Sequence, residues 1–104
     1  MNNVKKDERL GFLGLLYVAH KVVIGEELIE NFSKVSLLIM AKDATSNQSA
    51  SLKRKAERNH LPLIEDFSKA EMGQALGHEE ITFLGIIDKK AAGAYLKKST
   101  GGTR

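Results

Sequence analysis

The segment VSLLIM, at residues 35–40, constrains the fold of this 104-residue chain more than any other feature. It lacks the alternation of apolar and polar side chains that marks a strand with one face in water. Such a run is typical of a buried strand that is covered by helices on both faces. The sequence therefore predicts an α/β fold in which a sheet lies between two layers of helices.

Helical and extended patterns alternate along the chain. Helices are predicted at 9–20, 26–32, 46–59, 69–76 and 89–98, and strands at 22–24, 35–40, 61–64 and 81–87. This alternation is typical of a layered fold, so we expect a three-layer α/β/α sandwich around a small four-stranded mixed sheet. We expect one domain over residues 1–98 and a flexible tail over 99–104, which is rich in glycine and threonine.

Particular residues predict details of the strands and caps. The β-branched run at 22–24 predicts an edge strand. Pro62 fits the end or the edge of a strand, because proline donates no hydrogen bond to a neighbouring strand. Ser68 and Glu71 have the spacing of a capping box, and the helix that they begin is predicted to end at Gly77.

Two helices carry predictions about packing. Gly11 and Gly14 indicate that the first helix, which is apolar around most of its surface, approaches a neighbour closely. In the short helix that follows the first strand, Leu28, Ile29 and Phe32 are predicted to point inward.

The composition argues against several classes of protein. The chain has no cysteine, so it forms no disulfide or thiolate metal site, and a reducing cytoplasm suits it. Its three histidines lack metal-ligand spacing, and no catalytic arrangement is legible, so we expect no enzyme, no metal and no cofactor. No segment reaches the roughly 18 unbroken apolar residues of a membrane span. We therefore expect a cytoplasmic protein without membrane contact.

The net charge of +3 favours an anionic partner only weakly, and the distribution of charge is more informative. The whole positive excess lies in residues 1–60. One helix face within this part gathers four cations: Lys53, Arg54, Lys55 and Arg58. We interpret this face as solvated rather than as a binding patch, because a surface helix needs charged side chains there in any case.

A glycine opens the second predicted helix. A helix that begins at Gly25 presents unpaired backbone N–H groups and the positive end of its dipole at the rim of the sandwich. Layered α/β folds often bind phosphate at such a helix start. Glu26 and Glu27 follow in the first turn, and their plainest interpretation is that they complement the helix dipole.

Several short patterns occur in an order that points to one family. They are LGLL at 13–16, K-x-x-x-G-E-E-L at 21–28, A-x-D-A at 41–44, a proline-containing strand at 61–64, S-K-x-x-x-G-x-A-x-G at 68–77, and an apolar strand before Asp88. Together they resemble the bacterial YlxQ-type proteins of the kink-turn-binding ribosomal protein superfamily (L-seven-Ae and L-thirty-e), over residues 10–97. The resemblance implies a non-enzymatic α/β/α sandwich that binds sharply bent RNA, either ribosomal RNA or another kink-turn-like RNA.

The resemblance also implies which residues face the RNA, since the family binds through the start of its second helix and the loop before its fourth. The corresponding residues here are Lys21, Gly25, Glu26, Glu27, Asn31, Asp66, Phe67 and Ser68. Backbone N–H groups at 25–27 would meet phosphates, and a carboxylate or amide would accept the N–H donors of a guanine edge. Phe67 would pack against an unstacked base, or instead fill the core beneath its loop. Lys21 and Lys34 would supply a salt-dependent attraction.

This chain departs from the family pattern at several positions. Asn31 stands where a lysine is usual, Tyr17 and Val18 replace a basic pair on the first helix, and His20 replaces a glycine. The acidic pair at 65–66 would repel a phosphate backbone. These changes lower the expected RNA affinity. They support an alternative in which Tyr17, Val18 and neighbouring apolar residues dock a protein partner or a second copy of the chain.

Overall fold

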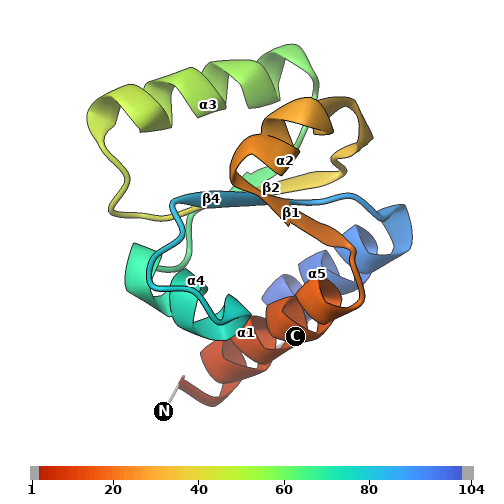
Figure 1. Cartoon of the computed structure of the whole chain (residues 1–104). Helices are drawn as coiled ribbons and strands as arrows, with labels where there is room; N and C mark the ends of the chain where they lie inside the picture. Colours follow the sequence, from red (N-terminus) through yellow and green to blue (C-terminus); the bar gives the residue numbers. More distant parts are fainter. Residues whose placement is uncertain (1–2, 102–104) are drawn as a thin grey trace.

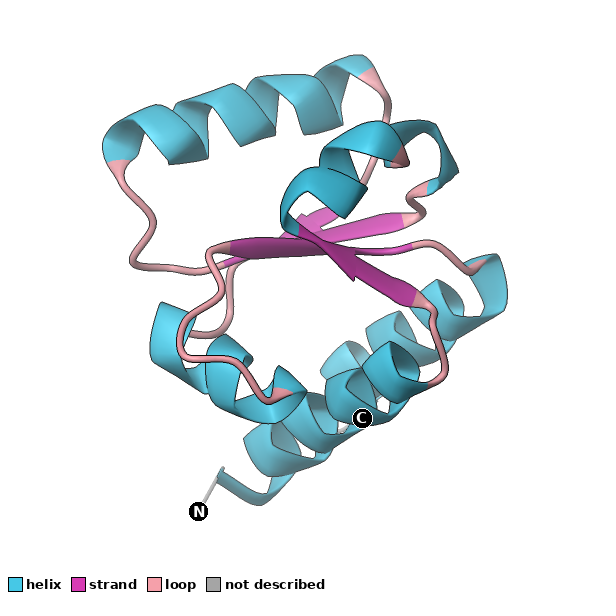
Figure 2. Cartoon of the chain, in the orientation of Figure 1, coloured by secondary structure: helices cyan, strands magenta, loops and turns pink. Residues whose placement is uncertain are grey.

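The computed structural model describes residues 3–101, with the side chains of residues 8–98. Its elements are α1 (Asn3–Val18), β1 (Val22–Ile24), α2 (Gly25–Glu30), the 3-10 helix η1 (Phe32–Lys34), β2 (Leu37–Met40), α3 (Ser46–Arg58), β3 (Leu63–Ile64), α4 (Lys69–Leu76), β4 (Phe83–Ile86) and α5 (Lys89–Gly101). Helices α2 and α3 cover one face of the sheet, and α1, α4 and α5 cover the other (Figures 1 and 2). The predicted α/β/α sandwich is confirmed.

The four strands form a mixed sheet in the order β1-β4-β2-β3. Strand β4 is antiparallel to β1 and β2, and β2 is parallel to β3. In this register Ile24 faces Leu84, and Met40 faces Phe83. One end of the sheet therefore carries the ends of β1, β2 and β3 together with the start of β4. The start of α2 and the loops around residues 41–45, 65–68 and 77–82 all lie at this end.

The core has two parts, one on each face of the sheet. Because strand side chains alternate, Leu37 and Ile39 pack with the α1, α4 and α5 side, while Leu38 and Met40 pack with the α2 and α3 side. None of these four residues of β2 is more than 1% exposed. The prediction that this strand is buried on both faces is confirmed.

Some predicted boundaries differ from the observed ones. The buried strand begins at Leu37 rather than at residue 35, because residues 32–34 form a 3-10 helix that the sequence did not indicate. The strands predicted at 61–64 and 81–87 shorten to 63–64 and 83–86. Helix α5 continues to Gly101, so residues 99–101 are helical where a flexible tail was predicted. Residues 102–104 of that tail lie outside the described residues.

Several local predictions about the strands and caps are confirmed. Strands β1 and β3 are the two edges of the sheet, and Pro62 directly precedes β3. Ser68 and Glu71 form both bonds of a capping box, and Gly77 ends α4 with φ of +83°. 

The packing predictions are only partly correct. A Cβ at Gly14 would lie 2.7 Å from the Ala75 carbonyl oxygen, so α1 does approach α4 closely there. Gly11 has open space around it, and the close packing predicted at that residue is wrong. Ile29 is 61% exposed, so its predicted inward position is also wrong, whereas Leu28 is buried.

Candidate nucleic-acid interface

Helix α2 begins without a side-chain cap. Its N-cap residue, Ile24, is extended and makes no capping hydrogen bond. The side chains of Thr45, Ser68 and Asp88, by contrast, accept hydrogen bonds from the first turns of α3, α4 and α5. Gly25 is exposed with φ of +58°, and a Cβ there would meet nothing within 4 Å. The first-turn N–H groups of α2 therefore lack a cap from any described side chain.

A hollow of about 280 Å³ lies beside Gly25. It is lined by Ile24, Gly25, Gln48, His78, Glu80, Ile81, Thr82 and Phe83. Because β1 and β4 are antiparallel neighbours, the loop at 77–82 that leads into β4 runs next to the start of α2. No pattern in the sequence singled out this loop, since its position depends on the strand order.

The other predicted contact region, Asp66 to Ser68, follows β3 at the same end of the sheet. Strand β3 is three strands from β1. The next residue after this loop, Lys69, nevertheless accepts a hydrogen bond at 3.1 Å from the amide of Ile81, which lines the hollow beside Gly25. Phe67 is fully buried, so it fills the core beneath its loop and offers no surface for an unstacked base. Ser68 accepts a hydrogen bond from the Glu71 amide at 3.1 Å and caps α4.

The acidic pair that precedes this loop is balanced by cations. Arg9 Nη1 donates to Asp66 Oδ2 at 2.6 Å, and Lys53 Nζ lies 3.2 Å from Glu65 Oε2. These partners come from α1 and α3, far away in the sequence. They reduce the phosphate repulsion that the sequence predicted for residues 65–66.

Three of the predicted RNA-facing residues come together in a groove between α1 and α2. The groove encloses about 500 Å³ and is lined by Tyr17, Val18, His20, Val22, Val23, Glu27, Asn31, Lys34 and Ile87. Glu27 of α2, its C-cap residue Asn31, and Lys34 at the end of η1 form one side of the groove. Asn31 Nδ2 donates to the Glu27 carbonyl oxygen at 2.9 Å, which ends α2. The groove thus joins the candidate RNA-facing residues to the end of α1.

One relative is similar in sequence to this chain over most of its length. The RNA-binding protein YlxQ of Enterococcus faecium is 34% identical over 92 residues, which cover 85% of this chain and 87% of that protein. The chain belongs to the YlxQ family. The resemblance of the sequence to YlxQ-type proteins is thereby confirmed.

The fold of this YlxQ-family chain recurs in solved structures. A protein of unknown function from Bacillus halodurans has a TM-score of 0.80 at 22% identity, with 86% of this chain and 94% of that chain covered. At that identity the likeness shows a shared fold. No protein-family model matches the sequence.

In this YlxQ-family protein, Lys21 forms an ion pair with Asp88 through Nζ and Oδ2. Asp88 Oδ1 also accepts hydrogen bonds from the Lys90 and Ala91 amides at 2.8 and 3.1 Å. The hydrogen bond from Lys21, followed by the bonds from the α5 backbone, lowers the pKa of Asp88 below its usual value. Lys21 is therefore balanced within the protein, and it contributes less to an attraction for RNA than the exposed Lys34 does.

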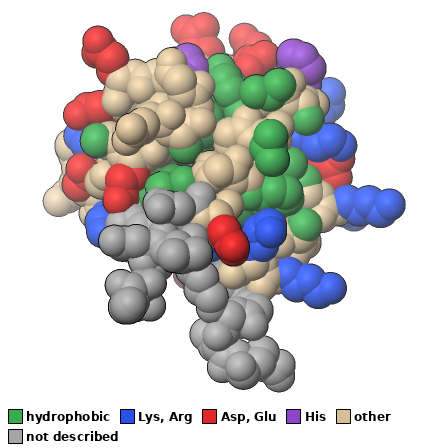
Figure 3. Space-filling model, turned by 90° about the horizontal axis from the view of Figure 1, so that it is seen from below, with side chains coloured by type: hydrophobic (Ala, Val, Ile, Leu, Met, Phe, Trp, Pro, Cys, Tyr) green, Lys and Arg blue, Asp and Glu red, His purple; other side chains and the backbone are tan. Residues whose placement is uncertain are grey.

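The surface of α1 carries exposed apolar side chains. Tyr17 Oη lies 2.9 Å from His78 Nε2, so Tyr17 contacts the loop beside Gly25 rather than standing free. Leu15 and Val18, in contrast, are 69% and 75% exposed. Figure 3 shows the face of the YlxQ-family protein that α1, α4 and α5 form, where hydrophobic side chains lie among charged ones.

The part of the chain that the structure describes contains neither a candidate membrane-spanning helix nor a candidate metal-binding cluster. None of its helices is long and apolar enough to cross a membrane. Within the same residues, no three histidine, aspartate or glutamate side chains gather closely enough to hold a metal ion.

Proposed function

We propose that this protein is a non-enzymatic, cytoplasmic RNA-binding protein that recognises a structured RNA of the kink-turn type, ribosomal or other. The E. faecium relative is named an RNA-binding protein. The observation that carries the proposal for this chain is the uncapped, exposed start of α2 beside a hollow. Backbone N–H groups at such a position bind phosphate oxygens, because the helix dipole and the unpaired donors act together.

The adjoining groove supplies the remaining contacts. Glu27, an exposed carboxylate that only accepts hydrogen bonds, suits the paired N–H donors of a guanine edge that bending has exposed. Lys34 neutralises a phosphate farther along the groove, and Asn31 lies between the two. In this proposal the protein recognises the RNA by its shape, by a few base contacts and by one exposed cation, Lys34.

Binding is tested by an electrophoretic mobility shift with a kink-turn RNA at low and moderate salt. We expect a shift that weakens as salt rises, because phosphate contacts release counterions. A fully paired duplex of the same length is the control and should bind more weakly. Absence of a shift at both salt concentrations would contradict the proposal.

The role of Glu27 can be separated from general charge effects. We expect Glu27→Ala to weaken binding by about tenfold or more, the size of a lost bidentate base contact, and to weaken it more than Lys55→Ala does. Glu30→Ala is the matched control, since both residues are exposed glutamates of α2. Loss of an acidic charge alone should strengthen binding to RNA. An unchanged or increased affinity of the Glu27 variant would therefore place the contact elsewhere.

Asn31 offers a test in the opposite direction. We expect Asn31→Lys to raise the affinity and to steepen the dependence on salt by about 0.9 in logarithmic slope, because one more phosphate is neutralised. Asn31→Ala controls for the lost hydrogen bond to the Glu27 carbonyl oxygen. Unchanged binding by the lysine variant would mean that residue 31 points away from the RNA.

A second candidate function is a protein-interaction module on the same fold. It is favoured by the exposed Leu15 and Val18, which lie three residues apart on α1. Sizing chromatography with light scattering tests it, with Val18→Asp as the disrupting variant. A dimer that this variant dissociates, together with no RNA shift, would favour the module over RNA binding.

A further inference from the structure

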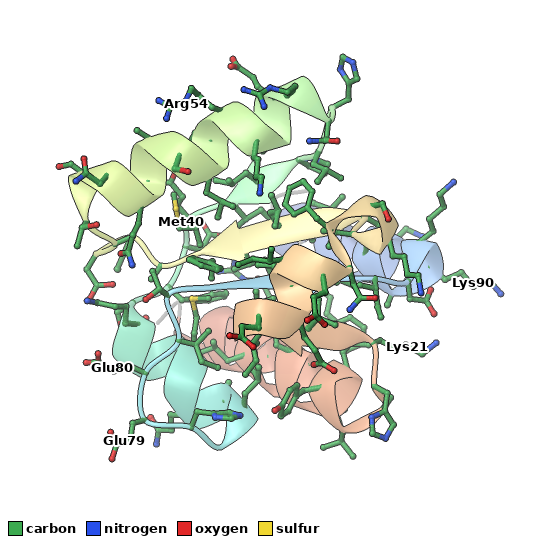
Figure 4. All side chains as sticks on the ribbon, turned by 45° about the horizontal axis from the view of Figure 1, so that its top comes forward. Lys21, Met40, Arg54, Glu79, Glu80 and Lys90 are labelled. Atoms are coloured by element: carbon green, nitrogen blue, oxygen red, sulfur yellow. The ribbon has the colours of Figure 1, made fainter. Side chains whose placement is uncertain are left out.

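The two ends of the sheet carry opposite charge. The end that bears the start of α2 is mostly acidic: its loops and first helical turn hold Glu26, Glu27, Asp43, Glu65, Asp66, Glu79 and Glu80 against Lys42 and Lys69. The opposite end is formed by residues 19–21, 31–36, 58–62 and 87–90, and it holds Lys21, Lys34, Arg58, Lys89 and Lys90 against Asp88. Figure 4 shows Lys21 and Lys90 at one end, and Glu79 and Glu80 at the other.

The segments of this second end lie side by side because the strands that they flank are paired. Three backbone hydrogen bonds join them: from the Ile87 amide to the Lys21 carbonyl oxygen at 2.9 Å, from the Ser36 amide to that of Ile86 at 2.7 Å, and from the Leu38 amide to that of Pro62 at 3.0 Å. Cations from separate parts of the sequence therefore gather here. We call Lys34, Arg58, Lys89 and Lys90 the basic end.

The basic end is not neutralised within the protein. The ion pairs of the described residues join Arg9 to Asp66, Lys21 to Asp88, and Lys53 to Glu65. They leave the four side chains of the basic end without a carboxylate partner among those residues, and all four are exposed. Glu30 and Glu57 stand in the last turns of α2 and α3, but Lys55 shares the last turn of α3 and the balance stays positive.

Lys89 and Lys90 have no structural explanation. They occupy the first turn of α5, which contains no acidic residue. Cations at this position oppose the helix dipole, whose positive end lies at the N-terminus. Arg58, at the end of α3, suits the dipole of its helix. An exposed pair that breaks a local rule without a compensating contact points to a function for the two lysines.

The surroundings indicate which anion the basic end suits. Its cations spread across the end of the sheet, an arrangement that fits a run of phosphates better than a single one. Phe32 is partly buried and has Lys55 Nζ 5.2 Å from its ring centroid, so it offers little surface to a stacked base. A double helix, whose bases are already stacked, needs only contacts to its backbone.

A membrane surface suits the basic end less well. Segments that enter lipid place large apolar side chains among their cations. The exposed large apolar side chains of the described residues are Leu15, Val18 and Ile29, and none of them belongs to the four segments of this end.

We propose that the basic end binds the phosphate backbone of a double-helical RNA segment, apart from the site at the start of α2. Lys89 and Lys90 contact phosphates from the α5 side, and Lys34 and Arg58 contact them from the side of η1 and α3. The binding is independent of sequence, because backbone contacts carry no base information. The inference goes beyond the proposed function and does not require recognition at Gly25.

The test is the affinity for a fully paired RNA duplex, measured by fluorescence anisotropy over a range of salt concentrations. We expect the Lys89→Gln/Lys90→Gln variant to bind about tenfold more weakly at low salt, with a logarithmic salt slope flatter by about 1 to 2, because up to two phosphate contacts are lost. Removal of cations from the start of a helix should not unfold the protein, and circular dichroism checks this.

Lys97→Gln/Lys98→Gln is the matched control. It removes the same charge from the same helix, and both lysines are exposed, but they lie toward the other end of α5. This variant should keep the wild-type slope. Equal losses in the two double variants would trace the effect to net charge and overturn the inference.

The remaining outcomes separate this inference from the proposed function. Absence of duplex binding by the wild type at low salt would overturn the inference and leave kink-turn recognition standing. Equal wild-type affinities for the duplex and for a kink-turn RNA, both reduced by Lys89→Gln/Lys90→Gln, would overturn the proposed function alone. Binding to phosphatidylglycerol vesicles through Lys89 and Lys90, without duplex binding, would assign the basic end to a lipid surface and overturn the RNA.

Discussion

His20 and His60 have left-handed backbones, with φ of 64° and 56°, and they are the non-glycine residues with positive φ in the described part of the chain. Each comes just after a helix, since α1 ends at Val18 and α3 at Arg58. Glycine is favoured there because a Cβ crowds the neighbouring backbone in this conformation. A glycine would therefore suit the backbone at position 20, as it would at position 60.

We expect His20→Gly to raise the free energy of unfolding by about 0.5–1 kcal/mol, because relief of the left-handed conformation outweighs the greater freedom of glycine in the unfolded chain. Urea denaturation measures the change. His20→Ala is the control and should bring no such gain, since alanine keeps the Cβ. An equal gain from alanine would trace the effect to loss of the imidazole.

Replacement by alanine should lower the stability of the protein at Gly73 and raise it at Gly11. A Cβ at Gly73 would lie 2.5 Å from the Glu79 carbonyl oxygen and 2.9 Å from the Glu80 Cα, so Gly73→Ala must displace the loop beside α2. We expect a loss of about 1–3 kcal/mol. Gly11→Ala, where the space is open, should stabilise α1 by about 0.5–1 kcal/mol. Thermal denaturation of both variants checks the signs, and a stable Gly73 variant would contradict the packing described here.

Among the elements, α3 and α4 both begin with a capping box, but they differ in how they pack against the rest of the protein. Thr45 with Gln48, and Ser68 with Glu71, form reciprocal capping boxes. Helix α4 packs against α1 through Gly14 and Ala75, whereas α3 buries only Leu52 and Ala56 among its residues. Fraying of α3 is therefore a more local event than loss of α4.

We expect Ser68→Ala to lower the free energy of unfolding by about 1 kcal/mol, the usual value of an N-cap. Thr45→Ala should cost less in global unfolding and should mainly increase hydrogen exchange within α3. Ser46→Ala is the control, because Ser46 is exposed in the first turn of α3 and is not the cap. Equal global losses for the Ser68 and Thr45 variants would mean that α3 unfolds only with the rest of the protein.

At the scale of the whole molecule, the Lys21–Asp88 pair joins two segments that are far apart in the sequence but lie together at one end of the sheet. It links the residue before β1 to the cap of α5, and the Ile87 amide donates to the Lys21 carbonyl oxygen at 2.9 Å beside it. The pKa of Asp88 is lowered in the folded protein, so the stabilisation is complete above the unfolded value of about 3.9. It is lost as the pH falls through the folded value.

We therefore expect Asp88→Asn to lower stability at pH 7 and to reduce the fall in stability between pH 5 and pH 2. Asparagine keeps a cap oxygen, so the change isolates the charge. Lys21→Met should cause a similar loss, because it removes the largest cause of the lowered pKa. Urea denaturation over this pH range measures both, and an unchanged pH dependence in the Asp88 variant would contradict the assignment.

The sequence by itself determined the layers, the element order and the family. The apolar run at 35–40, the capping box at Ser68 and the edge position of β1 depend on residues that are close together along the chain. Hydrophobic period, caps and turns are local properties, so they can be recognised without knowing the contacts. The exposed glycine start of α2 belongs to this class.

Only the tertiary structure decided which loop lies beside that helix start. The order β1-β4-β2-β3 brings residues 77–82 next to Gly25. The packing of the elements also buries Phe67, leaves Ile29 exposed and pairs Asp66 with Arg9. These outcomes join residues far apart along the chain, and strand order and side-chain packing are set by the free energy of the whole core rather than by any local pattern.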